Sequence, residues 1–379
     1  MLKLGIMATS RKAFERRLPI HPAHVQRIDD ELRPLVFLET GYGEAFGVSD
    51  DELAPHVGGM RAREDLIAEC DVILLPKPQA ADLAELRPGQ ILWGWPHCVQ
   101  DQELTQTAID SKLTLIAFEA MNHWHKDGSF SLHVLHANNE IAGYASVLHA
   151  LTLIGVTGSY GRRLRAIVLG FGSTARGAVR ACTAMDMAHI TVLTRRDTTA
   201  VASPMQSVEL LQHEPGWVGG EEGVVFTPSG DVPLPEFLAG YDVIVNCVLQ
   251  DPNRPMMFLT NADLPKLAPG TLVVDVSCDE AMGFEWAMPT DFDAPMFEVG
   301  DHVRYYSVDH TPTYLFDSAT WEISEALLPH LATVLEGPNA WAADPTVSRA
   351  VEIQDGVIRN PDILAFQSRS ADYPHQVQR

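Results

Sequence analysis

The feature that most constrains the fold of this chain is a short apolar run that ends in two closely spaced glycines. Residues 166–169 read Ala-Ile-Val-Leu, and Gly170, Gly172 and Ala175 follow in the pattern G-x-G-x-x-G/A. In this pattern the first glycine permits a tight turn, the second lets the backbone approach a pyrophosphate, and the small third residue lets a helix pack on the strand. The alternative is a plain strand–turn–helix. With a strand before it and a helix after it, the pattern predicts a dinucleotide-binding loop.

The end of the next predicted strand bears on which dinucleotide is bound. An NAD-dependent enzyme usually has an acidic residue there, about 20 residues after the glycines, to bind the ribose 2′-hydroxyl. This chain has Thr194 at that position, followed by Arg195 and Arg196. A guanidinium pairs with a 2′-phosphate, which a carboxylate would repel. The sequence therefore favours NADP, and NAD stays possible if Asp197 turns back toward the ribose.

Apolar runs alternate with stretches of helical periodicity, such as Pro22–Leu32 and Asp101–Ser111, along most of the chain, which is typical of βαβ units and parallel sheets in α/β proteins. One long helix is expected over Asn139–Leu153, between two series of strands. Val248, which ends a run that starts at Val243, is expected to contact the dinucleotide. The predicted strands are Leu2–Met7, Val36–Leu38, Val72–Leu75, Ile91–Trp95 and Leu113–Ala117, then Arg165–Leu169, Ile190–Leu193, Val224–Phe226, Val243–Val248, Leu272–Val276 and Arg304–Val308.

Other segments give weaker signals. The connection Arg195–Gly223 is polar and is expected to be partly irregular and exposed. Thr320–Leu335 has the length and periodicity of an amphipathic helix. In the tail, 337–379, one helix is predicted around Thr346–Ile353 and the last ten residues are expected to be loose. No role is predicted for this tail.

Charge and cysteine content exclude several classes of function. Acidic residues outnumber basic ones by 50 to 27, a net charge of −23, which argues against nucleic-acid or anionic-membrane binding. No apolar run is long enough for a transmembrane helix. The N-terminus resembles a first strand and lacks the features of a signal peptide. The five cysteines include no CxxC pair, and no cluster has metal-ligand spacing, so we expect reduced thiols, a cytoplasmic protein and no metal.

Charged side chains follow several predicted strands at the edge where parallel sheets bind ligands. Lys77 lies in Leu-Leu-Pro-Lys-Pro and His97 in Gly-Trp-Pro-His-Cys, each closing its strand. Arg17 lies in Glu-Arg-Arg-Leu-Pro-Ile-His-Pro and, taken alone, is more typical of a surface charge. Later in the chain, Asp279 lies in Val-Asp-Val-Ser-Cys-Asp-Glu, and Asp309 precedes a Thr-Pro-Thr turn.

Together these motifs resemble the alanine dehydrogenase/pyridine nucleotide transhydrogenase superfamily, from about residue 4 to about residue 330. In appearance the chain is closest to carboxyethyl-ornithine synthase, with features similar to lysine-forming saccharopine dehydrogenase. The resemblance implies that Arg17 binds a substrate carboxylate, that Lys77 binds substrate and can act in acid/base chemistry, and that His97 is the catalytic histidine. It also implies that Asp279 is a catalytic, active-site aspartate near the nicotinamide, although Glu-Ala-Met follows here where the family has Gln-Gly-Gly.

The same resemblance implies two Rossmann-like domains with parallel sheets and a cleft between them. The substrate domain would comprise 1–136 plus 309–379, and the dinucleotide-binding domain 137–308. Asp309 or His310 would lie near the substrate, where an acidic group suits a cationic amine; the alternative is that Asp309 stabilises a turn. Small-molecule amino and keto acids are the expected partners, and the chain is expected to form a homo-oligomer.

The implied activity is that of an NADP-dependent oxidoreductase acting on the CH–NH group of amino acids. The reaction expected is reductive condensation of a keto acid such as pyruvate with the amine of an amino acid such as ornithine or lysine. One alternative is an amino-acid dehydrogenase that uses ammonia. Another, of a different class, is a non-catalytic nucleotide-sensing protein. The sequence leaves the substrate pair and the physiological direction open.

Overall fold

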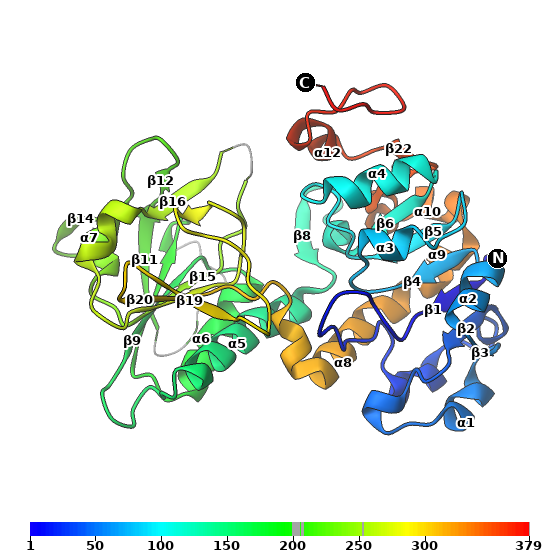
Figure 1. Cartoon of the computed structure of the whole chain (residues 1–379), viewed down its shortest axis with the longest axis horizontal. Coiled ribbons are helices and arrows are strands. Elements are labelled where there is room, and N and C mark those ends of the chain that lie inside the picture. The colour runs from blue at the N-terminus through cyan, green and yellow to red at the C-terminus, as the bar shows by residue number, and fades with distance from the viewer. Residues whose placement is uncertain (199–204, 206–207, 252–253, 379) are drawn as a thin grey trace. The chain divides into compact units, whose positions relative to one another are not determined.

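The chain folds into two compact units (Figure 1). The computed structural model describes residues 1–198, 205, 208–251 and 254–378. The first unit comprises Met1–His136 and Phe316–Arg379, and the second comprises Ala137–Leu315. The chain thus returns to the first unit after Leu315 and not at the expected boundary of 308/309. As a consequence, Asp309 and His310 belong to the second unit.

A mainly parallel sheet forms the centre of the first unit, with the order β22-β21-β6-β5-β4-β1-β2-β3. The strands from β1 to β6 run parallel, and β21 closes the sheet by pairing antiparallel with β6. All five strands expected here are present. The strands are β1 (Leu4–Ile6), β2 (Val36–Glu39), β3 (Gly59–Arg61), β4 (Val72–Leu74), β5 (Ile91–Gly94), β6 (Thr114–Ala117), β21 (Val351–Gln354) and β22 (Val357–Ile358), with a separate hairpin of β7 (Asn122–Trp124) and β8 (Phe130–His133).

The helices of the first unit are short. The expected helix over Asp101–Ser111 is α4, and the Asp101 side chain caps it by accepting a hydrogen bond from the Leu104 backbone N–H. Over Pro22–Leu32, in contrast, only a 3-10 turn forms, because the backbone becomes extended at Ile28, whose side chain is buried in the core. The α-helices are α1 (Asp50–Leu53), α2 (Arg63–Glu69), α3 (Ala80–Leu83), α4 (Gln102–Asp110), α8 (Phe316–Leu327), α9 (Leu331–Glu336), α10 (Pro338–Ala343), α11 (Pro345–Ser348) and α12 (Pro361–Phe366).

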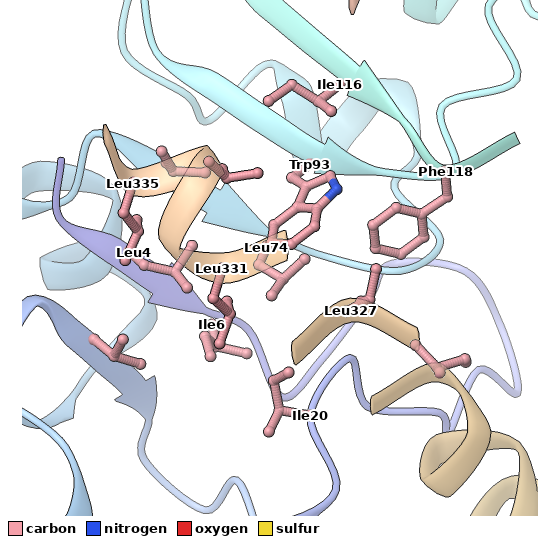
Figure 2. Close-up of a cluster of buried hydrophobic side chains, with 14 of the residues drawn as sticks. Leu4, Ile6, Ile20, Leu74, Trp93, Ile116, Phe118, Leu327, Leu331 and Leu335 are labelled. Atoms are coloured by element: carbon pink, nitrogen blue, oxygen red, sulfur yellow. The ribbon is translucent and has the colours of Figure 1, made fainter. Parts of the chain in front are cut away.

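The C-terminal part of the chain completes the core of the first unit. In Figure 2, Leu327, Leu331 and Leu335 of α8 and α9 face the strand residues Leu4 and Trp93. Burying one such leucine stabilises a fold by about 1.5–3 kcal/mol, so the N-terminal sheet depends on the returning segment. The single helix predicted over 320–335 is divided in two by a 3-10 turn that contains a proline, Leu328–His330.

Two expectations for the tail are wrong. The predicted helix around Thr346–Ile353 is only the short α11, and the chain then extends into β21. Pairing explains this, because β21 satisfies the open edge of β6. The last residues that the structure describes, up to residue 378, are not loose either: His375 is 1 % exposed and its ring accepts a hydrogen bond from the Ile358 backbone N–H.

The second unit contains a larger sheet, with the order β14-β13-β11-β10-β9-β15-β17-β20-β19. From β11 to β20 neighbouring strands are parallel, and the order matches the doubly wound 3-2-1-4-5-6 arrangement. Its strands are β9 (Arg165–Leu169), β10 (His189–Thr194), β11 (Val208–Glu214), β13 (Val224–Thr227), β14 (Gly230–Pro233), β15 (Val243–Asn246), β17 (Leu272–Asp275), β19 (Met296–Val299) and β20 (Val303–Tyr306), beside a small sheet of β12 (Gly216–Trp217), β16 (Met256–Leu259) and β18 (Gly283–Phe284).

The described part of the connection Arg195–Gly223 is exposed at 195–198 and 218–222, as expected, but it also contains regular structure. It contains β11, a strand of the parallel sheet itself, and Val224–Thr227 pairs antiparallel beside it. Residues 199–204 and 206–207 of this connection lie outside the described residues. No helix in the described ranges has both the length and the apolar character needed to cross a membrane.

Two glycines allow the long helix of this unit, α5 (His136–Leu153), to pack against α6 (Ser173–Ala184). A Cβ added at Gly143 would lie 1.9 Å from the Thr174 carbonyl oxygen, and one added at Gly177 would lie 1.7 Å from the Glu140 carbonyl oxygen. Only glycine fits at such separations. A further α-helix among the described residues of this unit, α7, covers Leu234–Leu238.

Candidate active site and dinucleotide loop

The glycine loop has the geometry that its pattern predicts. Gly170 follows β9 with a φ of +94°, a left-handed conformation that favours glycine. Its N–H donates to the Leu193 carbonyl oxygen over 2.8 Å. A Cβ at Gly170 would approach the Cys247 carbonyl oxygen and Val248 Cγ2 to 3.3 Å. The turn is therefore tight, and Val248 lies beside it.

Space for a ligand opens at the next glycine. A Cβ at Gly172 would meet no atom within 4 Å, and α6 starts directly after it. Ala175 is fully buried in the core beneath the helix. The first N–H groups of a helix are available to an anion, and the loop lies between β9 and β15, where the strand order reverses. These features fit the pyrophosphate of a dinucleotide.

Asp275 holds the loop after β17 in shape. It is buried, and its carboxylate accepts hydrogen bonds from the Tyr305 hydroxyl over 2.7 Å and from the Asn246 amide over 3.0 Å. The Ser277 backbone N–H also donates to it, over 3.1 Å. Asp275 is therefore a structural residue that caps this turn.

Asp279 follows in the same loop, at the carboxyl end of the sheet. Burial raises the pKa of its carboxyl to about 6. Ala281 has a φ of +55°, in the left-handed region that favours glycine. The loop therefore keeps a glycine-like backbone conformation at a position where the resembling family has glycine and this chain has alanine.

At the end of β10, Thr194 is buried and its hydroxyl accepts a hydrogen bond from the Arg196 backbone N–H over 3.2 Å. Both arginine side chains are exposed, and the Arg195 guanidinium lies 5.9 Å from the centre of the Trp217 ring. This position, after the second parallel strand, is where the ribose of a dinucleotide lies in a doubly wound sheet.

Asp309 and His310 contact each other. The distance from His310 Nδ1 to Asp309 Oδ1 is 2.5 Å, and His310 is 2 % exposed, with its ring edge-on to Phe292. The next residue, Thr311, hydrogen-bonds through its hydroxyl to Ser146 of α5. This arrangement anchors the segment, and it places both residues in the unit that carries the dinucleotide loop.

In the first unit, Arg17 is not a surface charge. It is 5 % exposed, and its guanidinium binds Glu15 through two bonds, Nε to Oε1 over 2.8 Å and Nη2 to Oε2 over 2.5 Å. The guanidinium also lies 5.2 Å from the ring centre of Trp95, which follows β5. The planar guanidinium group of Arg17 is thus oriented by Glu15 and lies near an aromatic ring.

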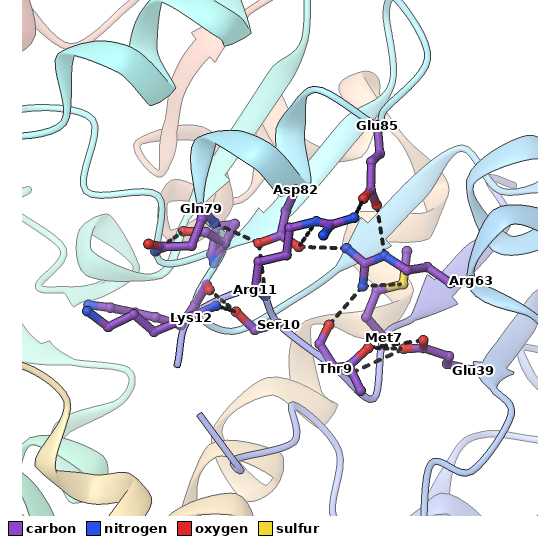
Figure 3. A network of polar contacts seen from close by, with 12 residues as sticks. Met7, Thr9, Ser10, Arg11, Lys12, Glu39, Arg63, Gln79, Asp82 and Glu85 are labelled. Carbon is purple, nitrogen blue, oxygen red and sulfur yellow. Dashed lines mark hydrogen bonds and ion pairs between the residues drawn. The ribbon is translucent and has the colours of Figure 1, made fainter. Parts of the chain in front are cut away.

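Lys77 follows β4, and its carbonyl oxygen accepts a hydrogen bond from the Ser10 hydroxyl. The loop that contains Ser10 is fixed by a network of ion pairs (Figure 3). In this network Arg63 bridges the carboxylates of Asp82 and Glu85 over 2.6 and 2.8 Å. The network therefore ties the segment between β1 and Arg17 to the end of β4.

His97 follows β5 in a left-handed conformation, with a φ of +48°. Its backbone N–H donates to Glu119 Oε1 over 2.7 Å, and its ring Nδ1 lies 3.9 Å from the same oxygen. The ring is 43 % exposed, so small molecules can reach it. Unusual backbone geometry of this kind is concentrated at functional sites.

Glu119 was not among the sequence candidates. It follows β6 as His97 follows β5, and that shared position was the signal by which it could have been found. Burial, together with the charge of Glu352, raises the pKa of its carboxyl to about 8, against the opposing effect of Lys77. The pKa of Glu119 therefore depends on both the His97 backbone N–H and the charge of Lys77.

In the first unit, therefore, Glu119, His97 and Lys77 follow the neighbouring strands β6, β5 and β4, and the Arg17 guanidinium lies near Trp95, beyond the end of β5. A buried guanidinium suits a carboxylate, and an imidazole beside a carboxyl can transfer protons. Within the described ranges, no group of histidine, cysteine and acidic side chains could hold a metal ion.

Two family models together match most of the chain. The N-terminal domain of alanine dehydrogenase/PNT matches residues 5–142, and the C-terminal domain of alanine dehydrogenase/PNT matches residues 147–361. The chain is 24 % identical to alanine dehydrogenase from Mycolicibacterium smegmatis, covering 92 % of each chain. It is also 24 % identical to N(5)-(carboxyethyl)ornithine synthase from Clostridium botulinum, covering 87 % of this chain and 94 % of that one.

Solved structures show the same fold. An L-alanine dehydrogenase superposes with a TM-score of 0.74 at 19 % identity, covering 96 % of this chain and 99 % of the other. A transhydrogenase from Sinorhizobium meliloti superposes with a TM-score of 0.68 at 20 % identity, covering 94 % and 99 %.

Proposed function

Because the chain belongs to the alanine dehydrogenase/PNT family of oxidoreductases, we propose that it reductively joins a keto acid to the amine of an amino acid. The keto acid would be one such as pyruvate, the amine that of ornithine or lysine, and NADPH the reductant. The observation that carries this proposal is that Lys77 and His97 follow the adjacent strands β4 and β5, and that the Arg17 guanidinium lies near Trp95, which also follows β5.

In this proposal, Arg17 holds the carboxylate of the keto acid, with Glu15 and Trp95 fixing the plane of its fork. The amine attacks the keto carbon, and water leaves to form an imine. Lys77 and His97 supply the proton that the departing oxygen takes up and accept the one that the nitrogen loses. A nicotinamide cofactor, when bound, supplies the hydride that reduces the imine carbon.

The choice of NADPH rests on Thr194, Arg195 and Arg196. No carboxylate stands at the position where NAD-dependent enzymes bind the ribose hydroxyls, and two exposed guanidinium groups follow it. The pyrophosphate of the dinucleotide would be lined by Gly170, Gly172, Ala175 and Val248. The nicotinamide ring would lie near Asp279.

A simple amino-acid dehydrogenase that uses ammonia is the second candidate. Its support is that the chain is as similar to an alanine dehydrogenase as to a carboxyethyl-ornithine synthase, with 24 % identity to each. The pair Asp309–His310 favours the first candidate, since an acidic group suits a cationic second amine, although the same contact also stabilises the turn.

One assay separates the candidates. NADPH oxidation is followed with pyruvate plus ammonium, then with pyruvate plus ornithine or lysine, and the products are identified by mass spectrometry. A secondary amine that joins both substrates supports condensation, and alanine alone supports the ammonia-dependent reaction. NADPH binding without turnover, across a panel of keto acids and amines, would indicate a nucleotide-sensing protein.

A further inference from the structure

Two guanidinium groups lie against the ring of Trp217, in the unit that carries the dinucleotide loop. The Arg254 guanidinium carbon lies 3.9 Å from the ring centre, and that of Arg195 lies 5.9 Å from the same centre. A cation within about 6 Å of a tryptophan ring is attracted to the negative charge of its face. One aromatic ring therefore brings together two cations from distant parts of the sequence.

The two arginines come from either side of the strand that leads into the glycine loop. Arg195 follows β10, and Arg254 lies in the segment between β15 and β16. In the sheet, β10 and β15 are the two neighbours of β9, and Gly170 follows β9. Val248, at the start of the segment that contains Arg254, lies beside Gly170. Both arginines thus belong to the edge of the sheet where a doubly wound fold binds a dinucleotide.

Backbone pairing holds Trp217 next to the segment that contains Arg254. The strands β12 and β16 are antiparallel neighbours (Figure 1), and the Val218 N–H donates to the Pro255 carbonyl oxygen over 3.2 Å. The Trp217 ring is half-buried and packs against the same core cluster as Val248. A guanidinium stacked on a fixed ring has fewer conformations to lose when it binds a ligand, so its donors are pre-organised.

The arginines at this edge are available to an anion. Arg195, Arg196 and Arg254 are all exposed. The ion pairs among the described residues of this unit are made by other basic side chains, namely Arg162, Arg180, Lys266 and His310. Burial and the charge of Arg195 lower the pKa of His213 to about 4, so this histidine is neutral at pH 7. The guanidinium charges repel one another, and an anion between them would be attracted by each.

We propose that Arg254, held on the ring of Trp217, binds the 2′-phosphate of NADP together with Arg195 and so helps to determine cofactor specificity. This inference rests on the choice of NADPH in the proposed function. In a doubly wound fold the ribose lies at the end of the second strand, which here is β10, directly before Arg195. Two guanidinium groups can hold the oxygens of one phosphate from two directions. NAD has a hydroxyl in place of this phosphate, so Arg254 discriminates between the two cofactors.

The test compares two nucleotides that differ only in the 2′-phosphate. Titration calorimetry measures the Kd of adenosine 2′,5′-bisphosphate and of adenosine 5′-monophosphate for the full chain. In Arg254→Ala the Kd of the bisphosphate rises by about tenfold or more, as expected for a lost charge-assisted contact, and that of the monophosphate stays within about twofold. Arg254→Lys keeps the charge without the planar fork and recovers only part of the affinity. An unchanged Kd of the bisphosphate, or an equal rise for both nucleotides, would overturn the proposal.

Trp217→Leu tests the role of the ring. Without the ring to hold Arg254, the Kd of the bisphosphate rises by about two- to fivefold, the value of a cation–π contact at an exposed site. The double variant Trp217→Leu/Arg254→Ala binds the bisphosphate about as Arg254→Ala does, because the two residues act together. Trp217→Phe, which keeps an aromatic face, binds more tightly than Trp217→Leu, and the thermal midpoint of each variant checks its folding. An equal loss of both nucleotides in Trp217→Leu would show that the ring binds adenine, contrary to the proposal.

A matched control and the parent protein separate the possible failures. Arg163→Ala removes an exposed arginine that precedes β9, at the opposite edge of the sheet, and should change both Kd values by less than about twofold. A parent that binds both nucleotides equally would contradict the choice of NADP and this inference with it. If Arg195→Ala/Arg196→Ala loses the preference for the bisphosphate and Arg254→Ala keeps it, only this inference is wrong. The expected losses in a protein without turnover would contradict only the proposed reaction.

Discussion

The backbone N–H of His97 donates to the carboxylate oxygen of Glu119 over 2.7 Å, across the ends of two adjacent strands. This bond holds His97 in a left-handed backbone conformation, with a φ of +48°. A non-glycine residue in a sparsely populated conformation costs about 1–3 kcal/mol, which the surrounding contacts must offset. The direction of the imidazole is therefore set by a neighbouring strand and not by local sequence.

Removal of either proposed proton-transfer group should reduce turnover without unfolding the protein. We expect His97→Ala and Lys77→Ala each to lower kcat by about two to four orders of magnitude. If both act on one step, the double variant should be little worse than the poorer single variant. The check is steady-state NADPH oxidation, with NADPH affinity measured by fluorescence as a control for folding. His125→Ala, which alters an exposed histidine, should keep parental turnover; near-parental turnover in His97→Ala would remove that residue from the mechanism.

Arg17→Lys preserves the charge but loses the planar fork that binds Glu15. The KM for the keto acid should rise by roughly tenfold or more, because a charge-assisted hydrogen bond is worth about 1.5–3 kcal/mol. The NADPH dissociation constant should stay the same. Arg16→Lys, at the neighbouring exposed arginine, is the matched control. Equal KM values for the two variants would place substrate binding elsewhere.

Arg195 and Arg196 should determine the choice of dinucleotide. Replacing both with alanine should weaken NADPH binding by about tenfold or more while leaving NADH binding nearly unchanged, since only NADPH has the 2′-phosphate. Titration calorimetry with both cofactors measures this. If the double variant loses equal affinity for both, the arginines do not recognise the phosphate.

Substitutions at two glycines near the start of α6 should have different effects, one on stability and the other on dinucleotide binding. Gly177→Ala puts a Cβ 1.7 Å from the Glu140 carbonyl oxygen, so the helices must move apart, at a cost of about 1–3 kcal/mol or more. Gly172→Ala meets no atom within 4 Å and should leave the thermal midpoint unchanged, but its methyl group should obstruct the dinucleotide. Thermal unfolding and NADPH titration of both variants test this; a normal midpoint in Gly177→Ala would contradict the packing.

Stability should depend on pH through Glu119. Its pKa is raised from the usual 4.5 to about 8 in the folded protein, so between these values the folded state binds more protons than the unfolded state. By linkage, this contribution to stability is fully present below about pH 4.5 and is lost as the pH rises toward 8. Urea unfolding across this range should show a decline that is smaller in Glu119→Gln. Identical pH dependence in the two proteins would exclude Glu119 as its source.

The sequence by itself determined the features that short segments encode. The strand, turn and helix around Gly170 and Gly172 depend on a few consecutive residues, because a left-handed turn and an open helix start require small side chains at fixed positions. The buried strands were recognisable as apolar runs, and parallel pairing then brings their ends to one edge. For this reason the sequence alone places Lys77 and His97 at the ends of strands, as it proposes for site residues.

The tertiary structure decided what depends on pairing between distant segments. The strand β11 is half polar, and β21 looked like part of a helix; each is a strand because a neighbour offers an open edge. The same pairing brings β21 beside β6, across more than 200 residues of sequence. Local composition does not determine such a contact. The stabilising free energy arises only when the two strand edges pair and their backbone N–H and C=O groups exchange water for hydrogen bonds to each other.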